Sequence, residues 1–95
     1  MVINLPIKYD EVNWSIRRSA RNQYVIEQKG KCWYCAADLS GKPPTKIRNK
    51  GINTGLFPPN FFKYPVHLHH DRKTGLTVGA VHNICNAVLW IYHGE

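Results

Sequence analysis

The stretch PVHLHHDRKTGLTVGAVHNICN, residues 65–86, carries the strongest pattern in the chain. Residues 65–71 alternate between apolar and polar side chains, which predicts a short strand. A turn over 72–75 and a second apolar-rich run over 76–81 complete a hairpin. The mostly apolar residues of 83–94 predict a buried helix that ends at a glycine. The order strand, strand, helix therefore predicts a ββα core over residues 65–95, the C-terminal third of the chain.

Two further zones precede this core. Residues 10–29 are predicted to form a helix, with Asp10 as its N-cap and Gly30 as its end. Three of its basic residues fall on roughly one side within two turns: Arg17, Arg18 and Arg21. Residues 31–64 are rich in glycine and proline and only weakly periodic. Such a long connection in a compact domain is usually functional or tied down by something else.

Length, composition and charge limit the classes of protein to consider. Ninety-five residues are enough for one α+β domain, residues 1–95, and not for two independent cores. The net charge of +7 points to an anionic partner. No apolar run approaches the roughly 20 residues that span a bilayer, and no basic-then-apolar leader opens the chain. We therefore expect an intracellular protein that is neither secreted nor bound to a membrane.

Two short pairs have the spacing of metal ligands: Cys32-x2-Cys35 and His82-x2-Cys85. Each pair can bind one ion from a single turn, and together they form a Cys3His set. Zinc accepts thiolate and imidazole at about 2.0 to 2.3 Å, and four protein ligands define a closed structural site. Two other interpretations stay open. The thiols could simply be buried, or the first pair could be redox-active, although no thioredoxin-like βαβ pattern surrounds it.

Three histidines lie within four residues of the predicted first strand. On a regular strand, His67 and His69 face one side and His70 faces the other. One side could then hold a metal ion while the other presents a base. Imidazole is the side chain whose pKa suits proton abstraction from water near neutral pH. The alternative is a histidine-rich surface strand without a catalytic role.

Together these motifs resemble the HNH nucleases, which carry a ββα-metal or His-Me finger motif. The chain is most similar to the phage recombination endonuclease VII-like proteins, whose pattern is HLDHDH…TG.VRGLLCxxCN behind an upstream CxxC. The matching architecture covers residues 31–95. The residues that carry the resemblance are Cys32, Cys35, His67, Leu68, His69, His70, Asp71, Thr74, Gly75, Gly79, His82, Cys85 and Asn86.

The resemblance implies a role for each matching position. His70 would be the general base that activates water, while His69 and Asn86 would hold a catalytic divalent ion such as Mg²⁺, Mn²⁺ or Ni²⁺. The zinc would be structural. Three positions depart from the pattern: His69 stands where Asp is usual, Arg72 where a further His is common, and His82 where Cys is usual. A neutral ligand at position 69 weakens the attraction for a hard ion such as Mg²⁺.

The implied activity is hydrolysis of DNA phosphodiester bonds by an endonuclease. If the protein is phage-encoded, it would act in the host cytoplasm. A non-catalytic, zinc-ribbon-like module that binds nucleic acid is the alternative. Cutting both strands of a duplex normally needs two active sites, which is compatible with a homodimer. Seven basic residues are candidates for phosphate contacts, although each alone is an ordinary solvated charge: Arg17, Arg18, Arg21, Lys46, Arg48, Lys50 and Arg72.

The aromatic residues of the middle zone could stack on bases, but in so small a domain most are expected in the core. The same expectation applies to Trp90 on the last helix. The middle-zone aromatics are Trp33, Tyr34, Phe57, Phe61, Phe62 and Tyr64.

Overall fold

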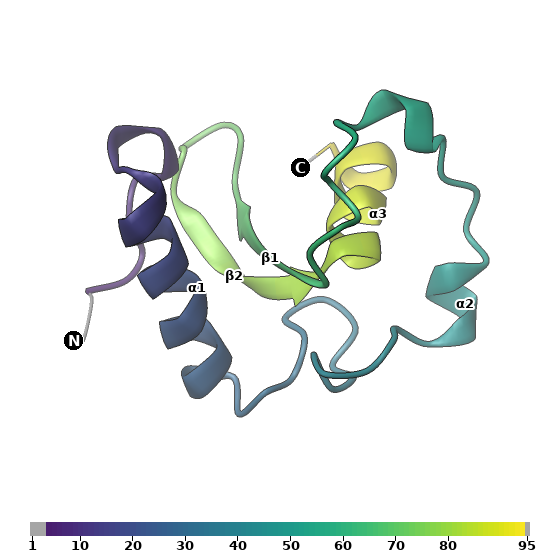
Figure 1. The fold of residues 1–95 in the computed structure, drawn as a ribbon, viewed down its shortest axis with the longest axis horizontal. Helices are drawn as coiled ribbons and strands as arrows, with labels where there is room; N and C mark the ends of the chain where they lie inside the picture. Colours follow the sequence, from purple (N-terminus) through teal and green to yellow (C-terminus); the bar gives the residue numbers. More distant parts are fainter. Residues whose placement is uncertain (1–3, 95) are drawn as a thin grey trace.

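The computed structural model describes residues 4–94 as a small α+β domain built on a two-stranded antiparallel sheet. The hairpin lies between α1 on one side and α3 on the other, with α2 beyond α3 (Figure 1). The elements in chain order are η1 (Tyr9–Glu11), α1 (Trp14–Glu27), α2 (Thr45–Arg48), η2 (Thr54–Leu56), β1 (Val66–His70), β2 (Thr77–His82) and α3 (Asn83–His93).

The predicted ββα core is confirmed. β1 pairs with β2 in a register that sets Val66 opposite His82 and His69 opposite Gly79. The turn between the strands closes through the Gly75 amide, which donates to the Asp71 carbonyl at 2.8 Å. Gly75 has a φ of 74°, a conformation that glycine adopts without steric penalty. A register shift between His69 and His70 interrupts the regular alternation of side chains at the end of β1.

The segment before α1 extends the sheet. The Thr77 amide donates to the Ile7 carbonyl at 2.9 Å, and the Tyr9 amide donates to the Gly75 carbonyl at 2.9 Å. The Ile7 amide in turn donates to the Thr77 hydroxyl at 3.0 Å. These bonds hold the chain next to the start of β2. They carry Tyr9 over the end of β1, which no local sequence pattern predicted.

The predicted N-terminal helix is shorter than expected. α1 begins at Trp14, because Asn13 accepts a hydrogen bond from the Ile16 amide at 3.0 Å and so caps it. The prediction that Asp10 is the cap is wrong, because Asp10 belongs to the separate 3-10 turn η1. The helix ends at Glu27, and the following chain turns through Gly30, whose φ is 75°.

One face of α1 packs against β2. Ala20 and Tyr24 are buried, and the Tyr24 hydroxyl shares a hydrogen bond of 2.9 Å with the Thr77 hydroxyl. One turn further on, the Gln28 side chain accepts from the Ala80 amide at 2.9 Å and donates to the Ala80 carbonyl at 3.0 Å. The positions i, i+4 and i+8 thus share one stripe on the sheet side. Arg17 and Arg21 lie three residues before Ala20 and Tyr24, so these arginines border the buried stripe.

The core lies between the sheet and α3 and consists of small and medium apolar side chains. α3 contributes Cys85, Val88 and Leu89, which lie at the i, i+3 and i+4 spacing of one helix face. Ala80 and Val81 of β2 are fully buried against them.

The expectation that most aromatic residues form the core is wrong. None of the six middle-zone aromatics reaches the buried class, and Trp90 is 38% exposed at the flank of α3. Phe57, Phe61 and Phe62 instead form a cluster with Trp90 outside the core, in which the Phe57 and Trp90 ring centroids are 5.4 Å apart. We call these four residues the loop aromatic cluster. Small and medium apolar side chains fill most of the interior, and Tyr24 of α1 is the one Phe, Trp or Tyr residue of the described chain that is buried in it.

Candidate functional site

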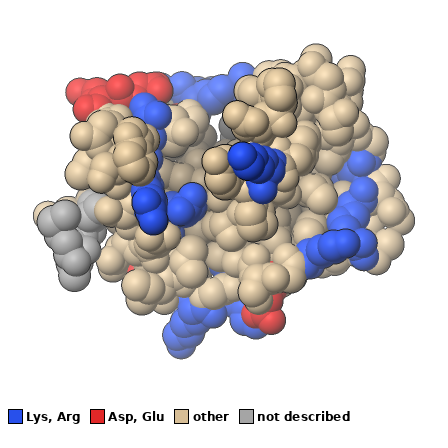
Figure 2. Space-filling view, viewed as in Figure 1, with Lys and Arg blue, Asp and Glu red and all other residues tan. Residues whose placement is uncertain are grey.

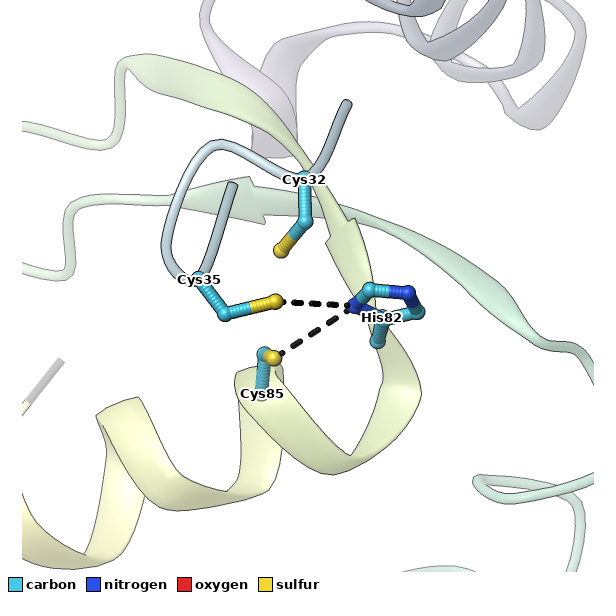
Figure 3. A group of neighbouring side chains, drawn as sticks. All are labelled: Cys32, Cys35, His82 and Cys85. Carbon is cyan, nitrogen blue, oxygen red and sulfur yellow. Dashed lines mark hydrogen bonds between the residues drawn. The ribbon is translucent and has the colours of Figure 1, made fainter. Parts of the chain in front are cut away.

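The two metal-ligand pairs converge as the spacing predicted (Figure 3). Cys32 and Cys35 lie in the turn that follows α1. His82 ends β2 and is also the N-cap of α3, while Cys85 lies in the first turn of that helix. The four candidate ligand atoms all lie within 4.8 Å of one another. The group could therefore hold a metal ion such as zinc.

The distances between the ligand atoms fit a tetrahedral ion. The Nδ1 atom of His82 lies 3.4 Å from Sγ of Cys35 and 3.6 Å from Sγ of Cys85. A tetrahedral zinc ion with ordinary bond lengths separates a sulfur ligand from a nitrogen ligand by about 3.5 Å. The three cysteines and one histidine are also the ligand types that zinc prefers.

The orientation of the His82 ring favours metal binding. Its Nε2 atom lies 2.8 Å from the Asp38 carbonyl oxygen, which can only accept, so Nε2 carries the proton. In the neutral ring Nδ1 then has its lone pair free of hydrogen and faces the sulfurs. A backbone carbonyl that fixes the ring of a histidine ligand in this way is a common feature of zinc sites.

The electrostatics of the cluster stabilise one thiolate. The hydrogen bond from the Cys85 thiol is the main reason that the pKa of Cys32 falls from 9.0 to about 4, although burial opposes it. The same bond keeps the proton on Cys85 and raises its pKa, and burial raises the pKa of Cys35. A bound ion would displace the remaining thiol protons, because zinc binds the thiolate form. The N-terminal end of α3 also favours the resulting negative charge.

A second feature is a cleft of about 1140 Å³ between α1, β1 and the segment 56–64. It brings together all three candidate catalytic residues and four of the seven candidate DNA contacts. Of residues 4–94, no aspartate or glutamate lines it. The polar and charged side chains of its lining include His67, His69, His70, Asn86, Arg17, Arg18, Arg21 and Arg72.

Asn86 links two histidines on the floor of the cleft. Its Oδ1 atom lies 3.2 Å from Nδ1 of His69, and its Nδ2 atom lies 3.2 Å from Nδ1 of His67. The amide oxygen can only accept and the amide nitrogen can only donate. His69 therefore donates through Nδ1, whereas His67 accepts through Nδ1. His69 and Asn86 are adjacent, as the resemblance implied.

His67 is a further site residue: its i, i+2 relation to His69 predicted a shared strand side but not its contact with Asn86. Phe61 of the loop aromatic cluster packs edge-on against its ring, with centroids 4.6 Å apart. Burial lowers the pKa of His67 below 6.5. His67 therefore stays neutral and holds the Asn86 amide in one orientation.

His70 lines the same cleft as His67 and His69, so the expectation that it serves the opposite side is wrong. The register shift before it changes the direction of the chain. Its ring stacks on Tyr9, with centroids 4.0 Å apart and planes 9° from parallel. The Arg17 guanidinium covers the other face of Tyr9 at 4.2 Å. Burial is the main cause that lowers the pKa of His70, which leaves it neutral near pH 7.

The His69 ring packs against the turn that carries two of the candidate zinc ligands. Trp33, which lies between Cys32 and Cys35 in sequence, stacks on the ring with centroids 5.8 Å apart. Trp33 in turn packs directly on Gly79, where an added Cβ would come within 3.0 Å of its side chain. Through Trp33, the turn with Cys32 and Cys35 is thus in direct contact with both strands of the hairpin.

The candidate phosphate contacts separate into two groups. Arg17, Arg18, Arg21 and Arg72 line the cleft, and Arg72 also lies 5.1 Å over the Trp90 ring. Lys46, Arg48 and Lys50 lie outside it, on α2 and the chain that follows. In Figure 2, basic side chains accordingly gather beside the hollow over α1, and a second basic group covers α2.

Neither a scan against protein-family models nor searches of the curated proteins and the solved structures returned a match for this chain. The resemblance to HNH nucleases therefore stays a prediction from the motif residues quoted above. Of the helices in residues 4–94, none has the length and apolar character needed to cross a membrane.

Proposed function

We propose that this protein is a metal-dependent DNA endonuclease of the HNH, ββα-metal type, stabilised by a structural zinc ion at Cys32, Cys35, His82 and Cys85. The observation that carries the proposal is the composition of one cleft. It holds a neutral half-buried imidazole, a histidine–asparagine pair 3.2 Å apart and four arginines, without an acidic side chain in its lining from residues 4–94. A polyanion is attracted to such a surface, and a phosphate can reach the imidazole there.

In the proposed reaction His70 accepts a proton from the attacking water. Its lowered pKa keeps the ring in the neutral form that a general base requires. The stack on Tyr9 holds the ring at a set angle to the cleft. Water attacks phosphorus and the bond to the 3′ oxygen breaks. That oxygen takes a proton from solvent water, so the products carry a 5′-phosphate and a 3′-hydroxyl.

Arg72 and the arginines of α1 would bind the phosphates on either side of the bond that is cut. Their positive charges position the strand without reading its sequence. His69 and Asn86 would hold the catalytic divalent ion in place of the proton that His69 Nδ1 otherwise donates to Asn86 Oδ1. When bound, the ion would supply charge neutralisation at the phosphate and at the departing oxygen. The donor set is one nitrogen and one amide oxygen without a carboxylate, so it suits Mn²⁺, Co²⁺ or Ni²⁺ better than Mg²⁺.

The test is nicking of supercoiled plasmid in the presence of Mg²⁺, Mn²⁺ or Ni²⁺. We expect nicking by the wild type and loss of at least about 100-fold in His70→Ala, the usual contribution of a general base. His93→Ala is the matched control, because His93 lies outside the cleft and contacts Tyr34 at 3.0 Å.

Two outcomes would contradict the proposal. Equal nicking by His70→Ala and wild type would remove His70 from the reaction. DNA binding by the wild type without cleavage in any of the three metals would favour the non-catalytic nucleic-acid-binding module instead.

A further inference from the structure

Large aromatic side chains stand exposed on two opposing walls of the cleft. Trp14, the first residue of α1, is 69% exposed, and Tyr64, just before β1, is 56% exposed. Both line the cleft. Leu56, in the same segment 56–64 as Tyr64, also lines the cleft and is likewise 56% exposed. Exposed apolar side chains that gather at a cleft usually mark a binding surface.

Most of the Trp14 side chain is not covered by the rest of the described chain, because it is 69% exposed. Among the ring–ring and cation–π contacts of residues 4–94, none involves Trp14. The buried face of its helix consists of Ala20 and Tyr24. The indole therefore contributes its faces to the cleft rather than to the core. Tyr64 has Lys63 over its ring at 5.7 Å, which adds a cation beside that face.

Charge and aromatic surface alternate around the cleft. Arg18 and Arg21 lie one and two turns after Trp14 on α1 and also line the cleft. A duplex presents phosphates and sugars to a protein surface, while the faces of its bases are hidden in the stack. Exposed rings next to guanidinium groups match a different ligand, in which flat apolar base faces alternate with phosphates along one strand.

We propose that the cleft binds unpaired nucleotides, with bases stacked on Trp14 and Tyr64 and the flanking phosphates bound by Arg18 and Arg21. The inference rests on the proposed function and names the substrate class of the same site: single-stranded DNA, or the unpaired segment of a larger DNA. The occupant follows from charge complementarity, since four arginines and no acidic residue of the described chain line the cleft.

The test is binding without added divalent ions, so that cleavage does not interfere. Fluorescence anisotropy would compare a short thymidine oligonucleotide, an abasic oligonucleotide with the same number of phosphates, and a duplex of the same length. Stacking of one base on an aromatic side chain contributes about 5- to 150-fold in affinity. We expect the thymidine strand to bind at least about 5-fold more tightly than the abasic strand. It should also bind more tightly than the duplex.

Substitutions separate stacking from charge. Trp14→Ala and Tyr64→Ala should each weaken thymidine binding by about 5-fold or more and leave abasic binding within about 2-fold, because only the base loses a partner. Trp14→Phe should restore most of the loss. Arg18→Ala should weaken both strands alike. Ile26→Ala is the control for the loss of an exposed apolar side chain, since Ile26 is 71% exposed on α1 and lies outside the cleft lining.

Equal affinity for the thymidine and abasic strands, or tighter binding of the duplex, would overturn the inference. So would an equal loss on both strands in Trp14→Ala, with circular dichroism confirming that the variant is folded. These results are independent of the plasmid assay. A protein that nicks DNA through His70 but shows no preference for bases keeps the proposed function and loses only this inference.

Discussion

The substitution Cys35→Ser distinguishes a zinc ligand from an ordinary thiol. Cys35 is only partly buried, so the serine hydroxyl, similar in size, creates no large cavity. If Cys35 were a simple surface thiol, the change would alter the free energy of unfolding by about 0.5 kcal/mol or less. A lost ligand has a much larger effect, because the Cys35 sulfur lies 3.4 Å from Nδ1 of His82 in a cluster of four ligand atoms.

The size of that effect follows from comparing two free energies. A domain of 95 residues has a total stability of about 5 to 14 kcal/mol. Structural zinc contributes apparent binding free energies of about 10 to 16 kcal/mol near pH 7. Loss of the ion therefore removes as much as the whole stability of the domain. We expect the wild type with a strong chelator, and Cys35→Ser without one, to be largely unfolded at 25 °C.

The assay combines far-UV circular dichroism, thermal melting and the zinc content of the purified protein by elemental analysis. His93→Ala, which touches no ligand, should keep one zinc per chain and the wild-type melt. A metal-free wild type with an unchanged cooperative melt would refute the reasoning, as would a Cys35→Ser variant with wild-type stability and no zinc.

Three further results are expected. Ala36→Gly should stabilise the protein by about 1 kcal/mol in urea unfolding, because Ala36 has a left-handed φ of 66° that glycine adopts without strain. Gly79→Ala should cost about 1 to 3 kcal/mol, since the added methyl meets Trp33 at 3.0 Å; an unchanged urea midpoint would contradict this packing. Burial lowers the folded-state pKa of both His67 and His70, so the unfolded chain binds more protons below pH 6.5. The two neutral histidines therefore contribute fully to the free energy of unfolding above about pH 6.5. This contribution is lost as the pH falls through their folded-state pKa values. Urea midpoints at pH 7.5 and pH 5.5 should therefore differ less in a variant with glutamine at both positions than in the wild type.

Local spacing was sufficient to predict the convergence of the four candidate metal ligands and the ββα core. Two intervening residues bring each pair of candidate ligands onto one turn, so the spacing alone indicates Cys32, Cys35, His82 and Cys85. The alternating strand, the glycine turn and the apolar helix are likewise properties of neighbouring residues. Asn86 follows the last ligand directly, and its place beside His69 was inferred from the motif.

The arrangement of the cleft depends instead on contacts between residues far apart in the chain. Tyr9 reaches His70 because the segment before α1 pairs with β2, and a cluster outside the core gathers Phe57, Phe61 and Trp90. No periodicity signals such contacts, since each partner lies in a segment with ordinary local preferences. The same reason explains why composition alone assigned these rings to the interior. Short-range geometry thus specified which four side chains could hold a metal ion, whereas the packing of distant segments placed the histidines, arginines and aromatic rings around one cleft.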